Sequence, residues 1–393
     1  MKKGWQTKTI GDLCEVIAGQ SPEGKFYNAE GKGMPFYQGK KDFGDKFIEA
    51  PTSWTTQTTK IAKEGDILMS VRAPVGPVNF ATDEVCIGRG LAAIRSNDEL
   101  NRDFLFYQLW HLQPEIAGRE GAIFASINKA EIEALPLAFA PLAEQQRIVG
   151  LLDEAFAGLA TAKANAEKNL QNARALFESH LQSVFTQRGP GWVEKPFSEL
   201  CDIKHGYAFE GEFFSNEGEY VLLTPGNFYE RGGYRDRGEK QKYYTEEIPR
   251  DYVLNEGDLL VAMTEQAAGL LGSPILAPES DKFLHNQRLG LVTKKPSVAW
   301  TNEFFFHVFN TQPVRKAIHA SASGVKVRHT SPTKIGEVVV AFPTSLPEQK
   351  RIVTTLASLT EETQRLARLY ERKLVLLEAL KKSLLHQAFT GEL

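Results

Sequence analysis

Apolar side chains recur at helical spacing near the end of the chain. Residues 348–389 contain neither Gly nor Pro, and a row of mostly apolar positions advances by alternating steps of three and four residues. The row consists of Leu356, Leu359, Thr363, Leu366, Tyr370, Lys373, Leu377, Leu380 and Leu384. This heptad pattern predicts one helix, roughly 63 Å long at about 1.5 Å per residue.

A second stretch of similar length lies in the middle of the chain. Residues 143–188 contain no Pro and carry a leaner row with several alanines. Its members are Leu152, Ala155, Leu159, Ala162, Ala166, Leu170, Ala173, Phe177, Leu181 and Val184. The stretch predicts another long helix, and small alanines allow a neighbouring helix to approach closely.

Helices this long with one apolar face are not stable alone in water. The simplest prediction is that the two pack on each other, antiparallel, with the domains that precede them at opposite ends. A parallel coil between two chains is the alternative. Leu376 and Leu385 lie outside the row and are expected to leave apolar surface for a further partner.

These stretches belong to an internal repeat. Residues 144–149 return as residues 348–353, 204 positions later, with a single change from Gln to Lys. Trp5, Lys8, Leu13, Cys14 and Gly19 reappear 187 positions later as Trp192, Lys195, Leu200, Cys201 and Gly206. The repeat is circular in pattern, so the two ends of the chain are expected to lie close together. Repeats of this kind determine the fold class and are identified first.

The repeat predicts an α+β protein in which two mixed α/β domains, in pseudo-two-fold arrangement, are separated by two long antiparallel coiled-coil helices. Residues 67–71 and 259–263 each follow a Gly-Asp turn and read as buried strands. Residues 103–107 and 303–307 open short helices that end near Pro114 and Pro313, and their aromatics are expected in the core. The predicted divisions are 1–141, 142–188, 189–345 and 346–393.

Composition adds little to this organisation. The formal net charge of −3 gives no global sign of nucleic-acid binding, so the local distribution of charge matters more. No run of 18 apolar residues and no apolar segment behind residues 1–5 is present, which favours a cytoplasmic protein without membrane partners. The three cysteines, at positions 14, 86 and 201, are expected to be buried free thiols.

The two domains share a framework but differ in their loops, which is how a scaffold carries recognition. Glycine lets backbone approach a ligand, and Lys and Arg neutralise phosphates or bind guanine edges. The candidate DNA-binding residues are Lys25, Lys40, Lys41, Arg72, Arg89, Lys204, Tyr207, Arg231, Arg235, Arg237, Arg288, Lys326 and Arg328. Taken singly, each cluster is more commonly a solvated loop, and the matched placement of the clusters in two repeats is what favours recognition.

Three arginines have distinct standing in the repeat. Arg89 matches Arg288, so this pair is expected to do a job common to both domains, either a structural hydrogen bond or a phosphate contact. The position equivalent to Arg72 in the second copy of the repeat is occupied by Thr264, so this arginine is not shared by the two copies. Arg72 is therefore the better candidate for reading sequence.

Motifs of catalysis are missing from the sequence. No Pro-Pro pair occurs, so the Asn/Asp-Pro-Pro-Tyr type of loop found in amino-methyltransferases is absent. No Walker A loop, no Gly-x-Gly-x-x-Gly after a strand and no zinc-like Cys/His spacing is present. The chain is expected to have no catalytic residues, to hold no metal and to bind no cofactor of its own.

Taken together, these features resemble the specificity subunit of Type I restriction–modification enzymes. The carriers are residues 141–148 and 346–352, the paired Trp5 and Trp192, the Gly-Asp strands and the segment from His205 to Phe209. The resemblance covers essentially the whole chain. One departure is that residues 141–143 and 345–347 each keep only part of the usual Pro-Leu-Pro run.

The resemblance implies a non-catalytic subunit that binds double-stranded DNA. Each domain would read one half of a split, asymmetric site, and the helices would fix the unread spacer. Two methyltransferase subunits would dock on the helices, covering the row of Ala162, Ala166 and Ala173 together with Leu376 and Leu385. Two restriction/translocase subunits would join them, and S-adenosylmethionine, ATP and Mg²⁺ would be held by these partners.

Three alternatives stay open at this point. A specificity subunit of a Type IIB system would have the same sequence features, and only neighbouring genes would separate it. A self-sufficient methyltransferase is opposed by the missing Pro-Pro loop. A coiled-coil scaffold that binds only protein would have domains without DNA affinity.

Overall fold

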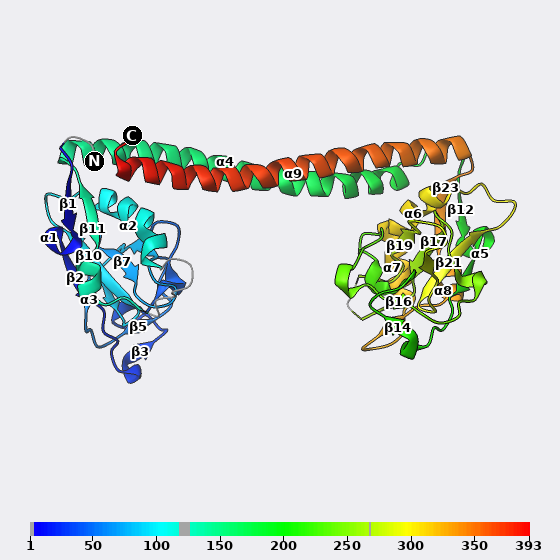
Figure 1. Cartoon of the computed structure of the whole chain (residues 1–393), viewed down its shortest axis with the longest axis horizontal. Helices are drawn as coiled ribbons and strands as arrows, with labels where there is room; N and C mark the ends of the chain where they lie inside the picture. The colour runs from blue at the N-terminus through cyan, green and yellow to red at the C-terminus, as the bar shows by residue number, and fades with distance from the viewer. Residues whose placement is uncertain (1–3, 118–125, 267–268) are drawn as a thin grey trace. The chain divides into compact units, whose positions relative to one another are not determined.

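The computed structural model describes residues 4–117, 126–266 and 269–393. It divides into two compact units, the first made of Met1–Lys168 with Tyr370–Leu393 and the second of Asn169–Leu369. Each unit contains one mixed α/β domain and a part of each long helix, α4 (Leu142–Thr186) and α9 (Leu346–Thr390) (Figure 1). The division into units therefore cuts across both helices.

The domain of the first unit is built on two sheets. One is antiparallel, in the order β2 (Cys14–Ala18), β10 (Leu91–Ser96), β7 (Ile67–Ser70), β8 (Val78–Phe80). The other runs β3 (Tyr27–Asn28), β5 (Trp54–Thr55), β4 (Met34–Tyr37), β9 (Val85–Ile87), β6 (Ile61–Ala62), with β4 and β9 parallel. A third pair joins β1 (Gln6–Thr9) to β11 (Pro136–Phe139). The helices are α1 (Ile10–Leu13), α2 (Arg102–Ile116) and α3 (Lys129–Glu133).

The domain of the second unit repeats the antiparallel sheet and the terminal strand pair of the first, and it differs in its other sheet. Its antiparallel sheet runs β13 (Cys201–His205), β21 (Leu289–Lys294), β17 (Leu259–Ala262), β19 (Pro274–Leu276). The other sheet runs β14 (Phe214–Ser215), β16 (Tyr243–Tyr244), β15 (Tyr220–Leu222), β20 (Phe283–Leu284). The pairs β12 (Trp192–Pro196) with β23 (Val339–Pro343) and β18 (Thr264–Glu265) with β22 (Arg328–His329) complete it. The helices are α5 (Phe197–Leu200), α6 (Asn302–Asn310), α7 (Gln312–Ser321) and α8 (Pro332–Gly336).

The cores contain the residues that the sequence pattern predicts. All four residues of β7 and of β17 are buried, and these strands lie inside their sheets. Phe104 and Phe304 are both 0% exposed, which confirms the aromatics of the short helices as core. One boundary differs from expectation, because α2 continues past Pro114 to Ile116, whereas Pro313 lies in the first turn of α7. A proline in a first turn is tolerated, since its missing N–H would have no helical partner there.

Within the first unit the two long helices run antiparallel. Lys163 of α4 pairs with Glu378 of α9 at 3.1 Å, and Arg147 donates to the carbonyl of Leu393 at 2.9 Å. The residue numbers of the contacting partners thus increase along α9, from 378 to 393, while they decrease along α4, from 163 to 147. This pairing inside one chain favours the antiparallel prediction over a parallel coil between chains.

The predicted row of α4 is confirmed along its whole length, since every member is buried or half-buried. Ala166 and Ala173 are 1% and 5% exposed, so the expectation that a partner protein covers them is wrong. Both alanines are already covered by the chain itself.

The predicted row of α9 is right at its start and wrong toward its end. Leu356 is 0% exposed, but Lys373 is exposed and Leu380 is 47% exposed. Leu385, predicted to be free for a partner, is 5% exposed and belongs to the core of the first unit. A straight helix has 3.6 residues per turn, so its buried face drifts by about 20° per heptad away from a strict seven-residue repeat. Leu376, at 57% exposed, is on the surface as predicted.

The two ends of the described chain meet in the first unit, as the circular repeat predicts. The rings of Trp5 and Phe389 both pack edge-on against Phe104, with centroids 6.2 and 5.2 Å away. Leu393 packs against the same core. The last turn of α9 therefore helps to close the first domain.

One glutamine of the repeated motif fixes each long helix to its domain. Gln145 is 0% exposed, accepts from the Asn101 N–H at 2.7 Å, and donates to the carbonyls of Ala140 and Glu99 at 2.8 and 3.1 Å. Gln349 makes the same three bonds with Thr301, Pro343 and Ala299, at 3.0, 3.0 and 2.9 Å. The groups bonded to Gln145 are all backbone, whereas Gln349 also accepts from the Thr301 hydroxyl at 3.3 Å.

We expect Gln145→Leu to lower the free energy of unfolding of the first unit by about 2–4 kcal/mol, because it leaves one N–H and two carbonyls without partners. The neighbouring Gln146 is exposed, so Gln146→Leu is a matched control that should change stability little. Denaturant unfolding of the two variants tests this. Equal stability would contradict the role given to Gln145.

The cysteines are free, as predicted. Cys86 and Cys201 are buried, but Cys14 is only half-buried, which departs from the expectation. Burial raises the pKa of Cys14 and of Cys201 to about 12, so both stay thiols at neutral pH. No helix in the described ranges is long and apolar enough to cross a membrane.

Candidate nucleic-acid interface

Four of the candidate cations gather around one cleft in the first unit. The cleft has a volume of about 720 Å³. Lys40 and Lys41 come from a 3-10 turn (Lys40–Asp42) beyond β4, Arg72 follows β7, and Arg89 lies in the turn between β9 and β10. The polar side chains of Ser21, Gln38 and Ser70 complete the lining with short backbone stretches. Residues from four separate loops are thus brought together by the two sheets.

Backbone hydrogen bonds hold these loops against one another. The Val71 N–H donates to the carbonyl of Gly90 at 3.0 Å, and the Gly88 N–H donates to the carbonyl of Tyr37 at 2.8 Å. A side chain at Gly90 would place its Cβ 2.1 Å from the carbonyl oxygen of Gln38, so only glycine fits there. The backbone of the cleft is therefore held by hydrogen bonds between its loops, and glycine is required at position 90.

The cleft is positive. No carboxylate belongs to its lining as the structure describes it, and only Lys41 has an acidic neighbour, Asp42 at 3.8 Å. Lys40, Arg72 and Arg89 are exposed and form no ion pair with any described residue. Exposed cations without ion-pair partners, in a cleft lined by polar side chains, are suited to bind the phosphates and purine edges of DNA.

Lys25, also predicted from the first domain, does not line this cleft. Its ammonium pairs with Glu23 at 2.7 Å and lies 5.0 Å from the ring centroid of Phe26. An exposed ion pair of this kind contributes little to the stability of the fold.

The second unit confirms the correspondence between Arg72 and Thr264. The Met263 N–H donates to the Arg288 carbonyl at 3.0 Å and the Thr330 N–H donates to the Met263 carbonyl at 2.9 Å. Val71 has equivalent bonds with Gly90 and Ile127, both at 3.0 Å. Arg288 lies between β20 and β21, as Arg89 lies between β9 and β10. The same bonds place Arg288 opposite Gly90 and Gln287 opposite Arg89, so the predicted match between Arg89 and Arg288 is wrong by one position, although both arginines lie in equivalent turns.

Lys204 and Tyr207 lie beside an aromatic platform. The Lys204 ammonium is 4.2 Å from the ring centroid of Tyr252, and it donates to the carbonyl of Asp251. Tyr207, 40% exposed, lies 5.3 Å from Tyr252 and 5.1 Å from Phe209, centroid to centroid. The platform positions both predicted residues at the surface.

Arg235 and Arg237 lie on a loop that is held from inside by one asparagine. Asn227 is 0% exposed, donates to Gln241 at 3.0 Å and to the carbonyl of Arg235 at 3.3 Å. Arg235 lies 5.9 Å from the ring centroid of Tyr229, and the Arg237 guanidinium lies against Gly226. The role of Asn227 was not predicted, because an asparagine in a loop usually faces solvent.

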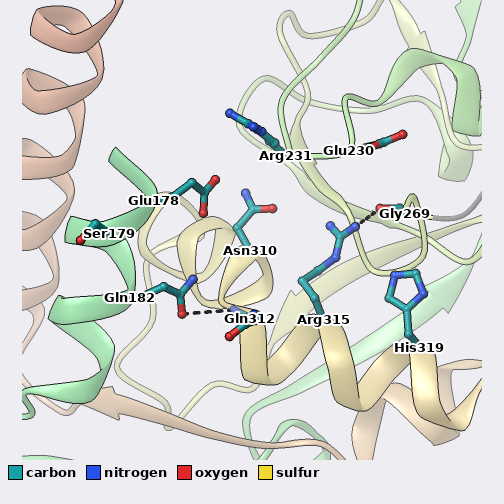
Figure 2. Close-up of a pocket in the computed structure, with 10 residues that line it drawn as sticks. All are labelled: Glu178, Ser179, Gln182, Glu230, Arg231, Gly269, Asn310, Gln312, Arg315 and His319. Atoms are coloured by element: carbon teal, nitrogen blue, oxygen red, sulfur yellow. Dashed lines mark hydrogen bonds between the residues drawn. The ribbon is translucent and has the colours of Figure 1, made fainter. Parts of the chain in front are cut away.

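Arg231 lines a different cavity, of about 530 Å³, within the second unit (Figure 2). Arg315 and His319 of α7 point into it together with Glu178 of α4 and Glu230 (Figure 2). Burial lowers the pKa of Arg315 to about 10, and one of its terminal nitrogens, Nη1, is buried without a hydrogen-bond partner among the described residues. Carboxylates and cations are mixed in this lining, so it suits DNA phosphates less well than the cleft of the first unit.

Arg328 and Lys326 differ sharply although they are two residues apart. Lys326 is exposed. The Arg328 guanidinium instead pairs with the buried carboxylate of Glu265 at 3.2 Å and donates to the carbonyl of His319 at 2.6 Å. Glu265, which the sequence did not single out, accepts three backbone N–H bonds from residues 269–271.

The described residues do not meet the requirements of a metal site. No group of three or more His, Cys, Asp or Glu side chains that could hold a metal ion occurs among the residues described.

Known proteins match this chain in sequence and in fold. The family model of the Type I restriction modification DNA specificity domain matches it twice, over residues 2–170 and 190–371. A putative type I restriction enzyme MjaX specificity subunit of Methanocaldococcus jannaschii is 39% identical over 174 residues, covering 43% of this chain and 40% of that protein. The chain spans about two fifths of the length of the curated relatives it matches.

Two solved structures share the fold. A chain from a structure concerned with complex assembly and conformational transition of the type I R-M system has a TM-score of 0.77 at 17% identity, covering 100% of this chain and 99% of that one. The HsdS subunit from Thermoanaerobacter tengcongensis has a TM-score of 0.67 at 17% identity, covering 100% and 98%. At these identities the likeness concerns the fold alone. Because the family model covers both repeats, the chain belongs to the family of Type I restriction–modification DNA specificity subunits.

Proposed function

We propose that this chain is the non-catalytic reader of a bipartite, asymmetric DNA site, acting in the cytoplasm, and that each α/β domain recognises one half-site. The observation that carries the proposal is the cleft of Lys40, Lys41, Arg72 and Arg89. Its cations come from three loops that backbone hydrogen bonds hold together, and the repeated frame carries different loops in the second domain. A shared frame with unlike loops is suited to reading two unlike sequences.

The long helices set the spacer in this proposal. Each is 45 residues long, or roughly 68 Å at about 1.5 Å per residue, and each continues without a break from one unit into the other. Half-site separation would then follow from helix length, as dimer geometry determines it in other DNA-binding proteins.

The exposed face of α9 docks two methyltransferase subunits in the same proposal. Leu369, Leu376 and Leu380 are 51%, 57% and 47% exposed and follow one another along that helix. An apolar strip of this kind is typical of a protein interface. Two restriction/translocase subunits would join the complex, with S-adenosylmethionine, ATP and Mg²⁺ held by the partners.

We expect Arg72→Ala to weaken cognate DNA binding by about 1–3 kcal/mol and to relax the preference at one position, because a guanidinium that reads a base edge is lost. Arg89→Ala and Arg288→Ala should instead weaken binding to all sequences and lower the salt slope by roughly one, as expected for phosphate contacts. Salt-dependent titration of the assembled methyltransferase with cognate and scrambled duplexes separates these effects.

Two results would contradict these assignments. A uniform loss for Arg72→Ala, with the cognate preference unchanged, would remove Arg72 from the base-reading set. Lower thermal stability of Arg89→Ala or Arg288→Ala at unchanged DNA affinity would make the substituted arginine structural. Lys25→Ala, which lies outside the cleft, serves as the surface control.

A further inference from the structure

A short hairpin in the second unit carries an aliphatic side chain almost wholly in solvent. Ser323 and His329 exchange both backbone hydrogen bonds, at 3.0 and 2.9 Å, and close the hairpin. Val325 at its tip is 98% exposed, and Val327 is 45% exposed. Lys326 between them is exposed and has no ion-pair partner among the described residues. The tip thus presents methyl groups beside a free cation.

The tip of the hairpin turns at one glycine. Gly324 has φ +99°, which side-chain-bearing residues rarely adopt. A Cβ there would also stand 2.1 Å from the carbonyl oxygen of Val327. The turn therefore requires glycine at position 324, and in this turn Val325 faces solvent.

The base of the hairpin is anchored by charge. Arg328 pairs with Glu265 at 3.2 Å, and the Glu265 side chain is 1% exposed. Glu265 also accepts from the N–H groups of Gly269 and Leu270, both at 2.9 Å. Residues 264–265 and 328–329 pair as a two-stranded antiparallel ribbon directly below the tip. A buried carboxylate with several donors resists movement, so the ribbon is fixed to the domain.

We propose that Val325 determines specificity in the second half-site by contacting the C5-methyl group of a thymine in the major groove, with Lys326 on a neighbouring phosphate. Arg328 is a positioning residue in this arrangement and does not touch DNA. The inference rests on the proposed function, because it supplies one contact of the second domain.

The chemistry at the tip selects the thymine methyl. A valine side chain has no hydrogen-bond donor or acceptor, and the major groove offers an apolar group only at the thymine methyl. The groove also admits a two-stranded ribbon. An exposed valine does not stabilise the free protein, because its apolar surface stays in water. A contact between the valine and a thymine methyl removes apolar surface of both partners from water and so favours binding.

Deoxyuridine, which lacks only the C5-methyl of thymine, tests the contact. The complex of the full chain with its methyltransferase subunits is titrated with the duplex motif found by methylome sequencing. Each thymine of the second half-site is replaced in turn by deoxyuridine. One replacement should weaken binding to the natural protein about fourfold, the factor for one buried methyl group. The same replacement should not affect Val325→Ser.

Matched variants separate this contact from general effects. Val339, 58% exposed on β23, gives Val339→Ser, which should keep the deoxyuridine penalty. Lys326→Ala should lower affinity for every duplex and keep the penalty. In Arg328→Ala, the deoxyuridine replacement should no longer weaken binding. If this variant were only less stable, its folded molecules would still bind the deoxyuridine duplex about fourfold more weakly. Arg328→Lys, which retains a charge for Glu265, should restore part of the deoxyuridine penalty.

Three outcomes would overturn the inference: no deoxyuridine penalty at any position, an equal penalty in Val325→Ser, or a second half-site with no thymine on either strand. These differ from failure of the proposed function. If the assembled complex did not distinguish cognate from scrambled duplex, the proposed function itself would be wrong.

Discussion

Exchange of residues 1–141 for the first domain of a related subunit should replace one half of the methylated motif and leave the other half unchanged. Each domain has its own core: Phe104 and Ile67 lie in one cluster, and Phe304 and Leu259 in another. The loops that line the cleft belong wholly to the exchanged segment. The change should be complete at one half-site rather than graded.

The junction at Pro141 suits such an exchange. Gln145 lies beyond it and bonds only to backbone groups of the domain, which any relative with the same helix start would supply. Side chains of the helices, such as Leu152 and Leu385, also pack on the domain, so some loss of stability is expected. Methylome sequencing of cells that carry the hybrid reads out both half-sites at once.

The reciprocal exchange of residues 189–345 is the matched control and should alter the other half alone. If either hybrid changed both half-sites while it remained active, the two domains would not read independently.

The sequence predicts the repeat and the class of fold because both depend on patterns that tertiary contacts do not override. Offsets between copies identify equivalent strands, and β7 and β17 lie where the Gly-Asp turns predict them. The row of α4 is also correct throughout, since all its members are buried or half-buried.

The errors on α9 have a physical cause. Leu380, Leu384 and Leu385 are all apolar, so the pattern is consistent with more than one buried face. A strict heptad selects Leu380, while the packing of the last turn against the first domain buries Leu385. The periodicity predicts the helix, but packing against the first domain determines which leucine is buried.

The site was predictable only in part. Lys40, Arg72 and Arg89 were candidates as cations in Gly-containing loops, but only the sheet order brings them to one cleft. Arg328 carried the same signal, yet it is held by Glu265, and no local pattern distinguishes a paired arginine from a free one. Gln145 and Gln349 were noticed as part of the repeat, and their role depends on contacts about 45 residues away.

Duplication of Thr161–Ala164 in α4 should lengthen the spacer of the recognised site by one or two base pairs and preserve both half-sites. Four residues add about 6 Å and rotate the rest of the helix by roughly 40°, since each residue contributes about 1.5 Å and about 100°. The buried positions Ala166 and Ala173 would then stay near the face that packs on α9. One base pair rises about 3.4 Å, so 6 Å corresponds to fewer than two.

Duplication of Lys163–Ala164 alone is the control that separates length from packing. Two residues add about 3 Å but rotate the following helix by roughly 200°, which would turn Ala166 and Ala173 toward solvent. This variant should lose stability and methylation together, whereas the four-residue variant should remain active on a longer site. Methylome sequencing gives the spacer in each case. An active four-residue variant with an unchanged spacer would rule out helix length as the determinant of half-site separation.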